Sequence, residues 1–202
     1  MPRRTKTFDL EEEKRRLNEQ LDELADKEAE DIRAEQAEGQ TSTPQWDRQE
    51  RREEAQRLEQ MLVGVEWALD PDNEDEIDPI EEVTLGALNA AEYGLVSDYM
   101  AEQVDQFQGP TEDGRGEQMR RAIFATGAII EAPFIDDDVR NSNISEKYRE
   151  VAQLAPQFVY WLEQRGDELT TPEVEGNGFA TRVEDKMTEE TAPPSTPSPK
   201  HS

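Results

Sequence analysis

LNAAEYGLVSDYMAEQVDQF, residues 88–107, is the stretch around which the rest of the chain is organised. Asn89 can cap the first turn of a helix, and Glu92, three residues later, completes a capping box. Leu88 and Tyr93 have the spacing of a hydrophobic staple. Apolar side chains recur on one helical face at Tyr93, Val96, Met100, Val104 and Phe107. This helix cannot bury such a stripe alone, so other apolar segments must cover it.

Two later segments are apolar enough to provide that cover. Residues 119–135 are the most apolar stretch, and Gly127 among alanines predicts the close approach of another backbone. A last helix is expected to begin at the cap Asn143, to be kinked or to restart at Pro156, and to end at Gly166. The predicted core joins the central stripe to Ile123, Phe124, Ile130, Phe158, Trp161 and Leu162.

A possible strand precedes the central helix. In VGVEWALD, residues 63–70, side chains alternate as in a half-buried strand. The helix expected at residues 45–61, with Thr43 as its cap and Pro44 at its first position, can also continue into this stretch. A second alternating run contains Ile80, Val83 and Leu85. The pattern predicts a small β-hairpin near residues 63–85, laid on helices.

The N-terminal segment is dense in helix formers and charges. Asp9 and Glu12 repeat the capping-box spacing at the start of a helix that extends to about Glu38. Leu17, Leu21 and Leu24 follow a heptad step that the later residues do not continue. We interpret this segment as a solvated helical arm; the alternative is a short docking or self-association helix.

These patterns predict a mainly α protein in three parts. Residues 1–44 form a charged helical arm and linker, and residues 45–169 form an acidic helical domain that contains the hairpin. Residues 170–202, rich in Thr, Pro, Glu and Ser, are expected to be a disordered tail. The folded domain is expected to persist when the first and last parts are removed.

The charge is strongly acidic and lies mainly on the expected domain. The net charge is −27, and residues 58–169 carry 7 basic against 26 acidic side chains, a net charge of −19. Repulsion of this size destabilises a compact state unless molar salt screens it. Six Lys against 16 Arg and 49 carboxylates resemble the composition of proteins from salt-accumulating halophiles. The alternative is an acidic DNA mimic or regulatory protein that binds a basic partner.

Several classes of site are missing from the sequence. The chain has no Cys, its single His is His201, and no HExxH, GxGxxG or P-loop spacing occurs, so we expect no enzyme, cofactor or metal site. The acidic turn at residues 70–81 follows a calcium-loop register, but Asp75 stands where that loop requires Gly. No apolar run reaches the length of a membrane span and no signal peptide is apparent, so a cytoplasmic location is expected.

The segment from Val65 to Phe107 resembles the opening of tail assembly chaperones of long-tailed viruses. In that family a short strand-like lead with an L-t-a-x-E step, here Leu88 to Glu92, enters an acidic helical domain without cysteine. The resemblance implies a non-enzymatic assembly factor that binds a tape-measure protein and tail-tube subunits in a halophilic host, without direct binding to nucleic acid. It carries over no functional residue.

A chaperone of this kind needs apolar side chains that its own core does not use. The unused hydrophobes of the expected arm and tail are the candidate partner-binding residues: Leu17, Leu21, Leu24, Trp46, Phe179 and Val183. An acidic body would keep the protein soluble while these few apolar contacts hold the client.

Overall fold

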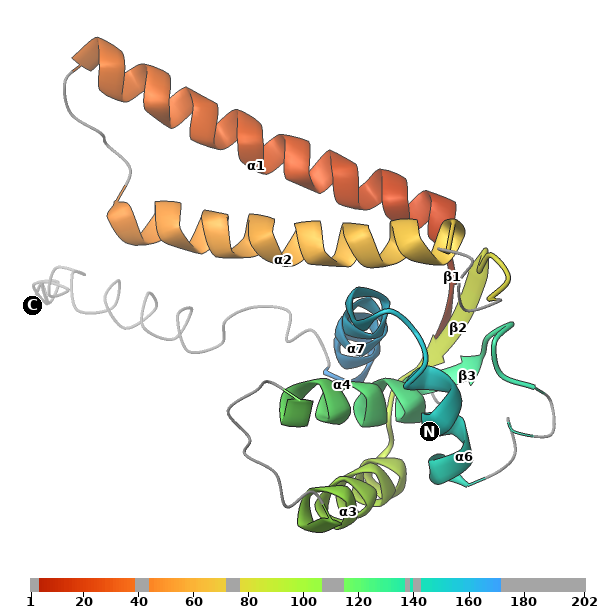
Figure 1. Cartoon of the computed structure of the whole chain (residues 1–202). Coiled ribbons are helices and arrows are strands. Elements are labelled where there is room, and N and C mark those ends of the chain that lie inside the picture. The colour runs from red at the N-terminus through yellow and green to blue at the C-terminus, as the bar shows by residue number, and fades with distance from the viewer. Residues whose placement is uncertain are drawn as a thin grey trace, which may run out of the picture. The chain divides into compact units, whose positions relative to one another are not determined.

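The computed structural model describes residues 4–38, 44–71, 77–106, 115–136, 139 and 143–171. Within these residues the chain is mainly helical with a small antiparallel sheet, which confirms the predicted fold class (Figure 1). The helices are α1 (Leu10–Glu38), α2 (Gln45–Leu69), α3 (Ala90–Gln106), α4 (Arg115–Ala128), α6 (Ile144–Val151) and α7 (Pro156–Thr170). The strands are β1 (Thr5–Asp9), β2 (Glu82–Gly86) and β3 (Ile129–Glu131). None of the described helices is both long enough and apolar enough to span a bilayer.

The sheet joins three segments that are far apart in the sequence. Its strand order is β1-β2-β3, and both pairings are antiparallel. Between β1 and β2, Thr5 lies opposite Gly86 and Asp9 opposite Glu82. Between β2 and β3, Thr84 lies opposite Glu131. The second run of the predicted hairpin is therefore a strand, but it pairs with the N-terminus and β3 rather than with residues 63–69.

Residues 63–69 belong to α2, so the strand prediction there was wrong and the continuing helix is correct. Buried positions in this part of α2 follow a helical spacing, at Met61, Gly64, Val65 and Ala68. Val63, which the alternating pattern placed with Val65, is 51% exposed. The segment is apolar on one helical face, and over seven residues that pattern resembles strand alternation.

The predicted helix starts at Asn89, Asn143 and Asp9 are confirmed. The backbone N–H of Asn89 donates to Glu92 Oε2 at 2.9 Å, and the N–H of Glu92 donates to Asn89 Oδ1 at 3.0 Å, which is a complete capping box. The Asn143 and Asp9 side chains accept from the N–H groups three residues on, at 3.1 and 3.0 Å. At α2 the cap residue is Pro44, one position later than expected.

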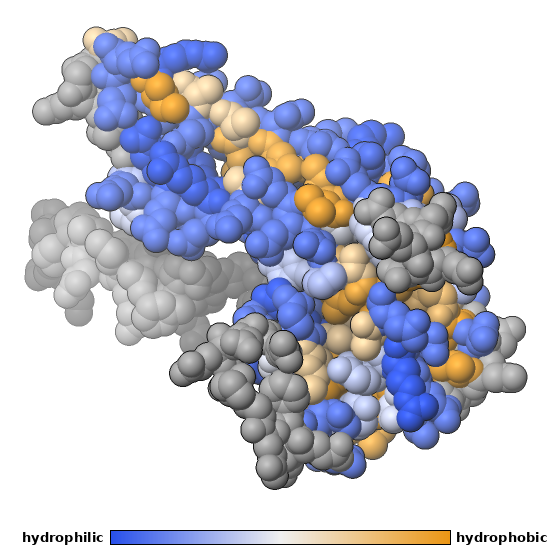
Figure 2. All heavy atoms as spheres, viewed as in Figure 1, coloured by the Kyte–Doolittle hydropathy of each residue, from blue (hydrophilic) through white to orange (hydrophobic). Residues whose placement is uncertain are grey.

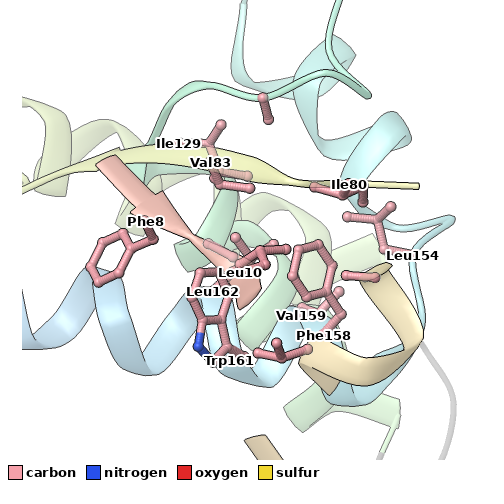
Figure 3. Packing of buried hydrophobic residues seen from close by; sticks show 14 of the residues in the cluster. Phe8, Leu10, Ile80, Val83, Ile129, Leu154, Phe158, Val159, Trp161 and Leu162 are labelled. Atoms are coloured by element: carbon pink, nitrogen blue, oxygen red, sulfur yellow. The ribbon is translucent and has the colours of Figure 1, made fainter. Parts of the chain in front are cut away.

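The main core lies between the sheet and α7 and also includes the N-terminal segment. Figure 3 shows Leu10 beside Trp161 and Phe158 of α7, beneath the strand that carries Val83, with the Phe8 ring on the other side of Trp161 from Phe158. The Phe8 and Trp161 rings meet edge-on with centroids 5.5 Å apart, and the Trp161 and Phe158 rings stack at 5.5 Å. Because Phe8, Leu10 and Leu17 are buried here, residues 1–44 are not a separable arm.

A buried ion pair also ties α1 to α7. Glu13 is 5% exposed and Arg165 is 4% exposed, and the Arg165 Nε–H donates to Glu13 Oε2 at 3.0 Å. Arg16 donates to the same oxygen at 3.0 Å, and Arg165 also donates to Glu168. Removing one partner of such a pair leaves an uncompensated buried charge, which typically costs about 3–5 kcal/mol. The first turns of α1 are therefore part of the folded body.

Close helix contact occurs at a glycine that the sequence did not single out. A Cβ on Gly64 of α2 would lie 2.3 Å from the Gln157 carbonyl oxygen, so the α7 backbone approaches here. A Cβ on Gly127 would instead meet the side chains of Val96 and Leu88 at 2.5 and 3.1 Å, so the backbone contact predicted there is wrong. Gly166 lies inside α7 against Ala128 and does not end that helix, which continues to Thr170.

The predicted single core is two clusters. Val96 of α3 packs with Leu88 and Ile123 in a small cluster, whereas Phe158, Trp161 and Leu162 belong to the main core. Tyr93 is 52% exposed, so the expected staple with Leu88 does not bury it. Phe124 and Ile130 are half-buried; the Val104 side chain and Phe107 lie outside the described part of the structure.

Candidate functional site

The structure separates the six predicted partner-binding residues. Leu17 is fully buried in the main core, which contradicts its assignment to an exposed surface. Leu21 and Leu24 are half-buried and pack against the same core. Trp46, at the start of α2, is 66% exposed and remains available. Phe179 and Val183 lie outside the described residues, as does the predicted tail from residue 172 onward.

The distal halves of α1 and α2 enclose a groove of about 720 Å³. Six acidic and three basic side chains line it, and Leu24 is its one apolar lining residue among those described. Figure 2 shows that hydrophilic residues cover most of the visible surface of this helix pair, with only a narrow row of hydrophobic residues among them. A groove of this composition is poorly suited to hold an apolar client.

A second groove, of about 700 Å³, has a different chemical character and lies between α3, α4 and α7. The capping box of α3 fixes the start of that helix, so one of its faces turns Tyr93, Ser97, Met100 and Ala101 into the groove. Phe124 of α4 and Tyr160 of α7 complete an apolar lining. Three aromatic rings and a methionine therefore face one surface depression.

The rim of this groove carries balanced charge in a chain whose net charge is −27. Its ionisable side chains are Glu117, Arg120, Arg121 and Glu163. The Arg121 guanidinium lies over the Tyr160 ring, 4.7 Å from its centroid, pairs with Glu117 and approaches Glu163 Oε2 at 3.5 Å. Arg120 is exposed and makes no ion pair within the described residues.

The Glu163 carboxylate is partly buried, and this burial changes its pKa. Desolvation raises its pKa above the usual value, and the positive charge of Arg121 opposes that rise. Glu163 thus has a weakly solvated carboxylate at the edge of an apolar depression. We name the surface formed by Tyr93, Met100, Phe124, Tyr160 and the four rim charges the α3–α4–α7 groove.

This arrangement can hold the apolar face of another chain. Aromatic rings supply a large contact area, and methionine adapts its shape to different partners. Arg120 is free to pair with a carboxylate at the margin of that partner. Helix-in-groove recognition uses this combination, in which an amphipathic helix places its apolar residues into a groove lined by side chains of several helices.

Met100 and Phe124 are half-buried and pack against the small cluster of Leu88, Val96 and Ile123, as their apolar spacing predicts, and they also line this groove. Tyr93 was predicted to join the core, but it is 52% exposed. Tyr160 and Arg121 were not singled out at all. The i, i+4, i+7, i+8 spacing of Tyr93, Ser97, Met100 and Ala101 marks a second face of α3, beside the face that Val96 buries.

Neither a metal site in the described residues nor a known relative indicates a different functional site. Within the described ranges no three His, Cys, Asp or Glu side chains converge as metal ligands, and residues 72–76 of the acidic turn lie outside those ranges. Comparisons of the chain with protein-family models, curated proteins and solved structures find no match.

Proposed function

We propose that this protein is a non-enzymatic assembly factor of the tail-assembly-chaperone type, working in a halophilic host. In this proposal the α3–α4–α7 groove binds an amphipathic helical segment of a long client such as a tape-measure protein. The acidic remainder of the surface keeps the complex soluble and hydrated in salt. Recruitment of tail-tube subunits is a second step that the same complex would support.

One observation carries the proposal: the α3–α4–α7 groove brings Tyr93, Met100, Phe124 and Tyr160 together on the surface of a very acidic chain. Tyr93 is 52% exposed although it begins an apolar stripe. Large apolar side chains at the surface of a monomer, rimmed by polar groups, are typical of a protein-binding site. The groove involves three helices, so its shape depends on the folded state rather than on one exposed segment.

The order of elements around the groove also supports the proposal. The strand β2 leads directly into the capped helix α3 through residues 87–89, which is the order that the family resemblance implies. Rim charges of both signs allow a client helix with polar flanks to bind without facing the full repulsion of the acidic body. The excess of carboxylates fits a cytoplasm rich in salt.

The test is co-expression with a candidate tape-measure protein in a halophilic host, followed by co-purification in high salt. Met100→Glu, in the groove, should abolish recovery of soluble client because a charge would enter the apolar contact. Tyr93→Ala should reduce it. Leu95→Ala is the matched control, since Leu95 is on the same helix, is 64% exposed and does not line the groove.

Two results would contradict this function. Equal losses from Tyr93→Ala and Leu95→Ala would remove the groove from client binding. A wild-type protein that leaves the client insoluble, and instead removes a basic protein from DNA, would favour the acidic-mimic alternative. Circular dichroism of each variant, recorded in the same buffer, separates loss of binding from loss of fold.

A further inference from the structure

The strand β1 forms an edge of the sheet with unused backbone groups. The Ala87 N–H donates to the Arg4 carbonyl at 2.8 Å, and the Leu10 N–H donates to the Glu81 carbonyl at 2.9 Å. In this register the backbone groups of the even-numbered residues of β1 form hydrogen bonds with β2. The backbone N–H and C=O groups of the alternate residues of an antiparallel strand point to its other edge. The N–H and C=O groups of Thr5 and Thr7 and the N–H of Asp9 therefore point away from the sheet, while the Asp9 C=O belongs to the first turn of α1 as its cap residue.

Nothing in the described residues continues the sheet beyond this edge. Figure 1 shows β2 between β1 and β3, so β1 and β3 are the two margins. Four of the five residues of β1 are exposed, and Phe8 is the buried exception. The opposite edge is shorter, since β3 has three residues and Pro133 follows closely, which removes a backbone donor. An open edge of five residues can pair with another strand.

The charge along this segment favours an antiparallel copy of itself as the partner. The basic side chains Arg4 and Lys6 lie at one end, and the acidic first turn of α1, with the exposed Glu11 and Glu12, follows the other end. An antiparallel second copy places the basic end of each strand beside the acidic end of the other. A foreign strand would not by itself provide these complementary ends.

We propose that two copies of this chain associate through β1, related by a two-fold axis at Thr7, to form one continuous six-stranded sheet. Thr7 lies opposite Thr7 of the second copy, and Thr5 lies opposite its Asp9. The outward N–H and C=O groups of Thr5 and Thr7 and the outward N–H of Asp9 supply the new ladder. This inference goes beyond the proposed function, because the α3–α4–α7 groove takes no part in it.

Salt controls this association through the whole-molecule charge. Two chains of net charge −27 repel over a Debye length of about 30 Å at 0.01 M salt, but over only about 3 Å at 1 M. Backbone hydrogen bonds of the ladder are not screened in the same way. The chain is therefore expected to be monomeric in dilute buffer and dimeric in molar KCl.

Cysteine cross-linking tests the register directly, because the native chain contains no Cys. In the proposed pairing the two Thr7 Cα atoms are about 5.5 Å apart, within the range that a disulfide spans. Mild oxidation of Thr7→Cys in molar KCl should give a covalent dimer on a non-reducing gel. Thr5→Cys is the matched control, since its two copies lie roughly 14 Å apart along the strands and should remain uncross-linked.

Sedimentation equilibrium of the full chain provides the second test. The wild-type mass should rise from 23.1 kDa toward twice that value as KCl increases. Thr7→Pro removes one outward N–H and should shift the chain to monomer, whereas Thr7→Val keeps that N–H and should dimerise like the wild type. Circular dichroism checks that Thr7→Pro is folded. A wild-type monomer at every salt concentration, or equal cross-linking of Thr5→Cys and Thr7→Cys, would overturn the proposal.

Discussion

At the scale of single residues, Gly64 determines how closely α2 approaches α7. A methyl group at this position would lie 2.3 Å from the Gln157 carbonyl oxygen and 2.7 Å from the Phe158 nitrogen. Both atoms belong to the backbone and cannot move aside as a flexible side chain would. We therefore expect Gly64→Ala to lower the free energy of unfolding by about 1–3 kcal/mol, measured by urea titration in high salt.

Gly94 supplies the control for that substitution. It also lies within a helix, α3, but a Cβ there would meet no atom within 4 Å. Gly94→Ala should raise the free energy of unfolding by about 0.5–1 kcal/mol, because alanine restricts the unfolded chain more than glycine does. If both substitutions changed the free energy of unfolding in the same direction, the close contact between α2 and α7 would be wrong.

Glu163 gives the α3–α4–α7 groove a pH dependence. Desolvation raises the pKa of this carboxyl in the folded state, so the folded chain holds the proton more tightly than the unfolded chain does. Stability contributed by Glu163 is therefore highest at low pH and falls as pH rises from the unfolded pKa through the folded pKa. Glu163→Gln should remove this fall, measured as the difference between wild-type and variant melting temperatures across that window.

The same experiment has an internal control at the groove. Ser97 of α3 also lines the groove, does not titrate and does not act on the Glu163 pKa. Ser97→Ala should shift the melting temperature equally at every pH. A pH-independent difference for Glu163→Gln would mean that burial does not perturb this carboxyl.

At the scale of elements, the α1–α2 pair is held by different forces along its length. Near the core, Leu17 and Leu21 of α1 belong to the same apolar cluster as Leu58 and Met61 of α2 (Figure 3 shows the neighbouring α7 side of this core). In the distal half, ion pairs replace apolar contact. Glu28 approaches Arg48, Arg51 and Arg52, while Asp31 pairs with Arg51 and Glu35 with Arg48.

Added salt should lower the local stability of the ion-paired half, whereas it should raise that of the core. Hydrogen bonding by Arg52 lowers the pKa of Glu28, so the stability from this carboxylate is present above its unfolded pKa and is lost as pH falls through its folded pKa. Salt screening weakens ion pairs that lie at the protein surface, as these half-buried pairs do. Hydrogen exchange followed by mass spectrometry should show faster exchange in residues 28–38 and 45–52 as KCl rises, and slower exchange in α7.

A matched pair of variants isolates the ion pairs. Glu28→Gln should accelerate exchange in the distal half of α1 and α2 at low salt and have little effect at molar salt. Glu23→Gln is the same substitution on the same helix, at an exposed carboxylate that makes no ion pair within the described residues. Acceleration by Glu23→Gln as strong as that by Glu28→Gln would exclude specific pairing as the cause.

At the scale of the whole molecule, the net charge sets the conditions for folding. Residues 58–169 carry a net charge of −19, and repulsion within that part opposes compaction at low ionic strength. We expect helical content and the melting temperature to rise between ~0.1 M and molar KCl as the Debye length shortens. Circular dichroism melts across this range measure the effect, and melting curves that coincide would contradict the halophile interpretation.

The whole fold also requires its N-terminus, contrary to the expectation that residues 1–44 can be removed. Deletion of these residues removes β1, the buried side chains Phe8, Leu10 and Leu17, and the Glu13 partner of Arg165. The remaining chain should show no cooperative melt in any salt. A chain that ends after Thr171 retains the whole compact unit that contains the described residues, and should melt like the full-length protein.

Local signals in the sequence were sufficient to predict the ends of several helices. Asn89, Asn143 and Asp9 cap helices because their side chains bond to backbone groups two or three residues away, and such contacts depend on sequence spacing alone. The restart at Pro156 follows equally from the missing N–H of proline. Helical periodicity and the density of helix formers predicted the mainly helical class for the same reason, since both are local features of the sequence.

Tertiary structure alone determined which segments share a core and which face of a helix stays exposed. The partner of β2 is β1, 77 positions away at Thr7 and Thr84, and only the folded chain brings these two strands together. Leu17 is buried and Tyr93 is exposed, although both occupy apolar helical stripes. A periodic pattern identifies a face but not its neighbour, because contact between distant segments depends on the packing of all of them at once.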